Sequence, residues 1–156
     1  MKGLGKYTFQ NGNYIEGEFD NYNIIGTEYN SSNNAIYKGK FYNFQRDGEG
    51  RYIFKDGGYV EGQFKNNKVN GYAKYVDKNG DTYEGQWVNN NLYDKEGKIT
   101  FDGGYYKGSI VNSQIQAGTF KSKNGIVYNA DFIDNQINGH AQIHFDKNTY
   151  LKGQFV

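Results

Sequence analysis

A five-residue pattern recurs seven times along this 156-residue chain at an almost constant step. Each copy has glycine or alanine at its centre, a large apolar residue two positions before the centre, and usually an aromatic residue two positions after it. The central residues are Gly17, Gly39, Gly62, Gly85, Gly108, Ala130 and Gly153, so that successive steps are 22 or 23 residues. A fixed period of this length is typical of a repeat array, in which each repeat packs against its neighbours.

Within each copy the side chains alternate between two characters, which is the period of a β-strand. One side, called the inner face here, carries the large apolar residues around the central one. They are Ile15, Tyr37, Val60, Tyr83, Tyr106, Tyr128 and Leu151 before it, and Phe19, Phe41, Phe64, Trp87, Ile110, Phe132 and Phe155 after it. The other side, the outer face, is rich in Glu, Lys and Gln and is predicted to face solvent. The small central residue leaves a gap that a ring from the neighbouring strand can fill.

A polar loop and a second strand follow each first strand, most clearly at residues 48–54. Asn-Gly or Asp-Gly dipeptides close the units at residues 11–12, 56–57, 79–80, 102–103 and 124–125, and such pairs favour tight turns. No stretch shows the apolar period of a helix. The sequence therefore predicts an all-β fold, an elongated and twisted single antiparallel meander sheet of about seven hairpins, with residues 1–156 forming one array.

The composition argues against several classes of function. Lys plus Arg is 18 and Asp plus Glu is 17, a balance that gives no general attraction to nucleic acid. The chain has no cysteine, and its two histidines, His140 and His144, would lie roughly 13 Å apart on one side of a strand, too far for one metal ion. We expect no catalytic site, no metal and no cofactor.

With both strands considered, the pattern resembles the MORN repeat (membrane occupation and recognition nexus). That family repeats Tyr-x-Gly-x-Trp/Phe, a short loop, Gly-x-Gly and an aromatic residue at about 23 residues. The resemblance covers essentially the whole chain and is best over residues 37–54, which include Gly48 and Gly50. It implies a twisted sheet of hairpins. We interpret the glycines of Gly-x-Gly as packing glycines.

Some positions depart from the family pattern. Ala130 replaces the central glycine, and Ile110 replaces the aromatic residue. The later glycines are replaced by Asp94 and Ala117 at the first position and by Glu28 and Glu96 at the second. Gly97 and Gly118 stand beside such positions and indicate one-residue shifts of the loop.

Two sets of residues are candidate binding sites. A tyrosine row on the outer face could contact a protein partner, or its members could only stack on one another; it comprises Tyr14, Tyr59, Tyr105 and Tyr150. A second set of lysines could attract anionic lipid head groups, although aspartates are interspersed. These lysines are Lys107, Lys121, Lys123, Lys147 and Lys152.

The resemblance implies a non-enzymatic interaction module, because similar arrays occur in ciliary radial-spoke heads, cytoskeletal scaffolds and membrane-junction proteins. Our first hypothesis is a protein scaffold in a ciliary or cytoskeletal complex, located in the cytoplasm, the axoneme or the cytoskeleton. The alternatives are a module that binds anionic phospholipids or phosphoinositides, and a regulatory arm of an enzyme on another chain. Two copies could also pair through the ends of the array, where edge strands present backbone groups.

Overall fold

The computed structural model describes residues 2–155, which form β-strands joined by turns. No helix long and apolar enough to span a bilayer occurs among these residues. The strands are β1 (Lys2–Thr8), β2 (Tyr14–Asp20), β3 (Asn23–Tyr29), β4 (Ile36–Tyr42), β5 (Gln45–Ile53), β6 (Tyr59–Lys65), β7 (Lys68–Val76), β8 (Thr82–Val88), β9 (Asn91–Leu92), β10 (Asp94–Phe101), β11 (Gly104–Val111), β12 (Gln114–Lys121), β13 (Val127–Ile133), β14 (Gln136–His144) and β15 (Tyr150–Phe155).

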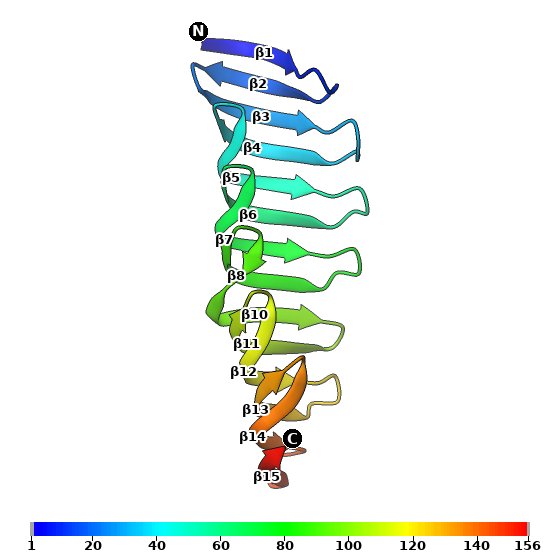
Figure 1. Cartoon of the computed structure of the whole chain (residues 1–156). Helices are drawn as coiled ribbons and strands as arrows, with labels where there is room; N and C mark the ends of the chain where they lie inside the picture. The colour runs from blue at the N-terminus through cyan, green and yellow to red at the C-terminus, as the bar shows by residue number, and fades with distance from the viewer. Residues whose placement is uncertain (1, 156) are drawn as a thin grey trace. The chain divides into compact units, whose positions relative to one another are not determined.

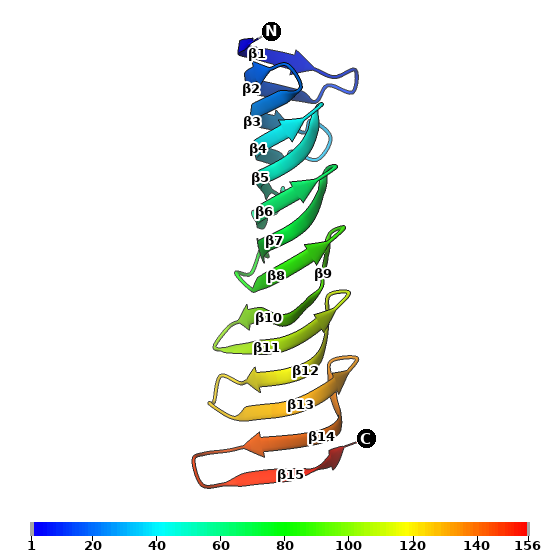
Figure 2. The ribbon, with the colours of Figure 1, turned by 90° about the vertical axis from the view of Figure 1, so that its left-hand side faces the viewer.

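The residues group into two compact units, 2–79 and 80–155. In the first unit, β1 to β7 pair antiparallel in sequence order, and the turns β3–β4 and β5–β6 lie on the same side (Figure 1). In the second unit the order is β8, β10, β11, β12, β13, β14 and β15, with β9 paired to β8 (Figure 2). The all-β antiparallel meander of hairpins predicted from the sequence is confirmed.

The predicted inner face supplies the core of each unit. In the first unit Ile15, Tyr37 and Phe41 are at most 2% exposed, and in the second unit Tyr106 and Ile110 are 1% exposed. The register explains this burial, because a central glycine pairs with a glycine of the returning strand, as Gly39 does with Gly50 and Gly108 with Gly118. The large side chains therefore fall into line on one face. The prediction fails at Leu151, which is 49% exposed, and Tyr83 and Tyr128 are only half-buried.

The hairpin tips are two-residue turns with left-handed backbone at both positions in most copies. Asn66 and Asn67 have φ of 48° and 66°, and Asn89 and Asn90 have 49° and 72°. Asparagine tolerates this region better than most residues, which explains the Asn-rich loops. These turns also connect successive hairpins, because the Asn67 N–H donates to the Arg46 carbonyl at 3.1 Å, and the Asn67 side chain accepts from the Arg46 N–H at 2.9 Å.

Phe44 departs from this turn chemistry. It has φ of 61° at a position where the tips of the later hairpins carry Asn or Ser. A bulky side chain is unfavourable in the left-handed region. The Phe44 ring packs on Tyr7 at 4.5 Å between centroids and lies 6.1 Å from Phe9, and these contacts offset the backbone cost. Both partners belong to the segment of β1 and its following turn.

The returning strand of most hairpins contains extra residues, which the sequence pattern did not show. Between the pairs Gly39–Gly50 and Phe41–Arg46, Lys40 alone lies opposite residues 47–49, which is a β-bulge. Similar irregularities occur after Gly62, Gly108 and Ala130. The first hairpin has none, since Gly17 pairs with Gly26 and Phe19 with Ile24.

The bulges correct two sequence interpretations. Gly48 is not a packing glycine: it has φ of 95°, and the Lys40 side chain lies over it. Glu28 does not occupy a glycine position, because in the regular first hairpin Gly26 takes that place and Glu28 pairs with Ile15 and Tyr37. The inferred loop shifts are confirmed, since Gly97 and Gly118 both pair with Gly108.

Candidate functional site

Tyr37, two residues before the central Gly39, is one of the buried tyrosines that pack on the inner face. Tyr37 is 1% exposed, its ring covers Gly50, and its hydroxyl donates to the carbonyl of Lys40, the residue opposite the bulge, at 3.0 Å. A Cβ on Gly50 would occupy the space of this ring. Burial raises the pKa of Tyr37, so the hydroxyl stays protonated and remains a donor.

The same arrangement recurs in the second unit. The Tyr106 hydroxyl donates to the carbonyls of Ser109 at 2.8 Å and Ala117 at 3.0 Å, and burial raises its pKa. Where the small residues carry a methyl group, the arrangement changes. Ala130 pairs with Ala141, and the two methyl groups take the space that a flat ring needs, so Tyr128 remains half-buried. The tyrosine ring therefore packs less closely over the small residues at β13 and β14.

This loosening accompanies a groove with a volume of about 510 Å³ in the second unit. Residues of the strands form one wall of the groove. The hairpin tips form the other wall and contribute Ser113 and Asn135. The lining residues carry no charge. They are Tyr83, Ile99, Phe101, Tyr106, Ser113, Ile115, Phe120, Tyr128, Phe132, Asn135 and Ile137.

Ring contacts fix the shape of the groove. Phe101 and Phe120 stack with centroids 5.2 Å apart, and Phe120 meets Tyr128 edge-on at 5.6 Å. Tyr106 meets Phe132 edge-on at 5.8 Å. Such contacts hold aromatic side chains in defined orientations. The groove is thus a preformed apolar surface with a few polar groups at its edge, as in many binding sites.

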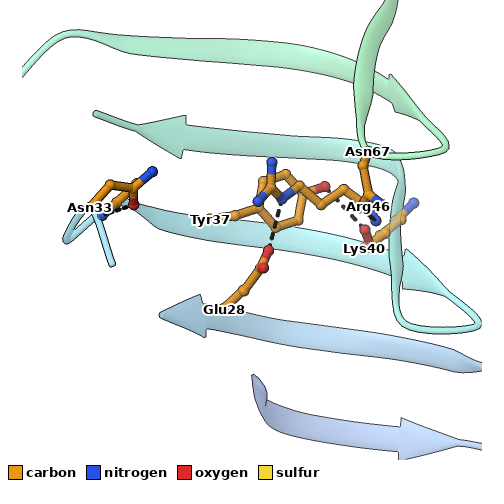
Figure 3. A network of polar contacts seen from close by, with 7 residues as sticks. Glu28, Asn33, Tyr37, Lys40, Arg46 and Asn67 are labelled. Carbon is orange, nitrogen blue, oxygen red and sulfur yellow. Dashed lines mark hydrogen bonds and ion pairs between the residues drawn. The ribbon is translucent and has the colours of Figure 1, made fainter. Parts of the chain in front are cut away.

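The first unit carries a charged pair at the corresponding positions (Figure 3). Arg46 pairs with Phe41 as Ile115 pairs with Ile110, so Arg46 is the counterpart of Ile115 near a hairpin tip. Glu28 pairs with Tyr37 as Ile99 pairs with Tyr106, so Glu28 is the counterpart of Ile99. These partners follow from the register of the strands. The counterparts of Glu28 and Arg46 in the other repeats occupy the same two positions of the inner face. Among all the described strand residues at these positions, Glu28 and Arg46 are the charged ones.

The two charges are joined across the inner face. The Arg46 Nε lies 2.8 Å from the Glu28 Oε2, and the two side chains are 16% and 15% exposed. The Arg46 guanidinium also lies 4.5 Å from the Tyr52 ring centroid and 5.5 Å from that of Tyr37. Arg46 therefore reaches from the tip of its hairpin toward Glu28, close to the Tyr37 ring (Figure 3). The second unit has its groove at the corresponding positions.

The tyrosine row predicted from the sequence lies on the outer face, and its members contact their own neighbours. Tyr14 stacks on its cross-strand partner Tyr29 at 4.6 Å, and the Lys6 ammonium lies 3.6 Å from its centroid. The Arg51 guanidinium covers Tyr59 at 3.8 Å. Tyr105 is half-buried, and Tyr150 is 60% exposed. A protein-binding role for this row stays a prediction.

The predicted lysine set is spread over several elements. Lys107 and Lys152 lie on β11 and β15, Lys121 ends β12, and Lys123 and Lys147 lie in turns. Lys123 binds Asp102 at 2.8 Å, and Lys107 lies 3.9 Å from Glu96. These acidic partners reduce the local positive charge, and lipid binding stays a prediction.

The histidines contribute no metal site within residues 2–155, where no cluster of three or more His, Asp or Glu side chains could hold an ion. His140 is exposed on β14, and His144 lies 5.6 Å from the Tyr150 ring.

The groove itself was missed by sequence reasoning. The sequence contained one signal for the groove. Ile115 and Ile137, two residues after their hairpin tips, are aliphatic, whereas the second repeat has the charged Arg46 at the same position.

These observations define a repeat protein built from β-hairpins. The family model for the MORN repeat matches residues 1–14, 37–59, 61–82 and 83–92, and the chain is a MORN-repeat protein. The MORN repeat is a non-catalytic module, and MORN repeats in general bind proteins or membranes. A search of the curated proteins found no match.

Among solved structures, one similar chain is the TCP domain of SAS-4 (dCPAP) from Drosophila melanogaster, determined in complex with a proline-rich motif of Ana2 (dSTIL). The two chains share 13% identity with a TM-score of 0.59, and the match covers 98% of the present chain and 84% of the other. This similarity concerns the fold.

Proposed function

We propose that this protein is a non-enzymatic protein–protein interaction scaffold whose second unit binds an extended, proline-rich segment of a partner. The observation that carries the proposal is the uncharged aromatic groove between β8 and β14. Aromatic-lined grooves are a recurrent way of binding polyproline II segments, which lose little conformational entropy on binding. The proline-rich ligand of the SAS-4 domain, which shares the fold, supports the choice of ligand.

The spacing of the groove supports the same ligand. Each hairpin adds two strands, which advance the sheet by about 9.6 Å. A polyproline II helix advances about 9.3 Å per turn of three residues. Every third residue of such a segment can therefore meet the same kind of ring on successive hairpins. Its backbone carbonyls are free to accept hydrogen bonds, and Ser113 and Asn135 bring polar groups to the groove.

A transplant of the charged pair tests the groove. Replacing Ile99→Glu and Ile115→Arg together should place an ion pair across the groove, as Glu28 and Arg46 do in the first unit. We expect a synthetic proline-rich peptide to bind the double variant at least about tenfold more weakly than the parent chain. Isothermal titration calorimetry measures the affinity, and thermal unfolding confirms that the variant is folded.

The matched control makes the opposite change in the first unit. Glu28→Ile with Arg46→Ile removes the charged pair and leaves the second unit untouched, so peptide affinity should stay unchanged. Equal binding by the parent chain and the folded groove variant would rule out this groove as the site.

The cellular part of the proposal rests on the family resemblance. We place the scaffold in the cytoplasm, as a subunit of a ciliary or cytoskeletal complex. Affinity purification of the full chain from its native source, followed by mass spectrometry, should recover ciliary or cytoskeletal proteins. Tyr59→Ala with Tyr105→Ala should reduce their recovery if the tyrosine row takes part, and unchanged recovery would remove that row from the binding surface. Recovery of an enzyme, pairing of two copies through β1 and β15, or co-sedimentation with anionic liposomes would each favour the corresponding alternative.

A further inference from the structure

The outer face of the first unit contains a hollow with a volume of about 410 Å³ that neither the groove nor the tyrosine row uses. Exposed apolar side chains surround it, with Ile25 63% and Tyr42 54% exposed. Tyr22, 65% exposed, lies 6.3 Å from Tyr42 between ring centroids. Tyrosine and isoleucine side chains left this open to solvent on one surface are typical of an interaction site.

Lys40 gives this apolar hollow a positive charge. It lies on β4, alone opposite the bulged residues 47–49 of β5, and a bulge changes the direction of the side chains around it relative to the strand. Its aliphatic stem packs over Gly48, and it is the cross-strand partner of Ile25. Within residues 2–155 Lys40 makes no ion pair with a carboxylate.

The other charges around the hollow leave that of Lys40 available. Lys65 and Asp47 also line it, and they pair with each other at 2.9 Å. Glu18 lies on the far side of Ile25, as its partner in β2, and is 4.0 Å from Lys2. A second hollow of about 420 Å³ adjoins the first and shares Lys40, Asp47 and Lys65 with it.

We propose that this hollow binds a segment of a partner protein in which an aromatic or aliphatic side chain stands next to a carboxylate. The apolar side chain would pack against Ile25 and Tyr42, and the carboxylate would accept a hydrogen bond from the Lys40 ammonium. A charged hydrogen bond beside a buried apolar contact gives both affinity and orientation. The position opposite the bulge makes the site specific to this repeat, because in later repeats that position carries Gln63, Ser109 and Asp131 instead.

The test is an NMR titration of the full ¹⁵N-labelled chain with two blocked pentapeptides, Glu-Phe-Asp-Ile-Asp and its basic counterpart Lys-Phe-Lys-Ile-Lys. We expect the acidic peptide alone to cause saturable shifts, centred on the amide signals of residues 23–25 and 40–42. Lys40→Gln should weaken its binding about fivefold, and this variant should fold because Gln63 occupies the equivalent position opposite a bulge. Tyr42→Val, which introduces the residue type that Val88 and Val111 supply at the same place in later repeats, should weaken it as well.

The matched control is Lys38→Gln, which removes a positive charge from the outer face of the same strand without touching the hollow. Its affinity for the acidic peptide should equal that of the parent chain. Equal binding of both peptides, equal losses in the Lys38 and Lys40 variants, or saturable shifts confined to other residues would each overturn the proposal. The outcome is independent of the groove in the second unit, because the two sites share no residue.

Discussion

Gly50→Ala is expected to lower the free energy of unfolding by about 3 kcal/mol, a large effect for one added methyl group. The Cβ would overlap the Tyr37 ring, which is 1% exposed and held in place by its hydrogen bond to the Lys40 carbonyl. The ring has no free space to move into without breaking that bond. Urea unfolding followed by circular dichroism measures the loss.

A second substitution should reduce the damage. In the next repeat Val60 stands in place of Tyr37 and Ala73 in place of Gly50, and both are buried. Tyr37→Val alone should cost about 2–4 kcal/mol, and the double variant should cost clearly less than the sum of the two single changes. Gly5→Ala is the matched control, because a Cβ there meets only Phe19 at an ordinary 3.6 Å. Additive losses would show that the ring and the glycine are not coupled.

Removing one member of the Glu28–Arg46 pair should have a comparable effect. Glu28→Leu would leave the Arg46 guanidinium without a partner at 16% exposure, and we expect a loss of about 3 kcal/mol. The low end of the usual range applies because both side chains retain some contact with water. The control is Glu16→Leu, since the exposed Lys6–Glu16 pair should contribute at most about 1 kcal/mol.

Replacing both charges should restore most of the stability. Glu28→Tyr with Arg46→Val reproduces the residues of the following repeat, where Tyr52 and Val69 occupy these positions. Substituting an ion pair with apolar residues that pack well is often neutral or stabilising. A double variant that is less stable than Glu28→Leu would show that the pair itself stabilises the first unit.

The alternation of side chains predicted the inner face well, because a strand has a strict period of two residues. It placed Ile15, Tyr37 and Phe41 in the core without any knowledge of their partners. It could not place Glu28 or predict the groove. Both depend on the number of extra residues in each returning strand, and that number differs between repeats whose sequence patterns look alike.

Candidate binding residues were harder to predict than the fold. The outer-face tyrosines were chosen because tyrosine is common in interfaces, yet Tyr14 and Tyr59 each carry a cation over the ring. The groove instead uses inner-face rings that sequence reasoning assigned to the core, such as Tyr128. Whether a ring is covered depends on methyl groups on its own strand and on the paired strand, as at Ala130 and Ala141, and the pairing of the two strands is not visible in a linear pattern.

The turn between β4 and β5 also affects how the first unit opens. Because the Phe44 ring rests on Tyr7 and lies near Phe9, the beginning of the chain is held by a hairpin tip some 35 residues later as well as by its neighbour β2. Exchange of the β1 amide hydrogens with solvent should therefore follow the opening of that tip. An outermost strand would otherwise fray on its own.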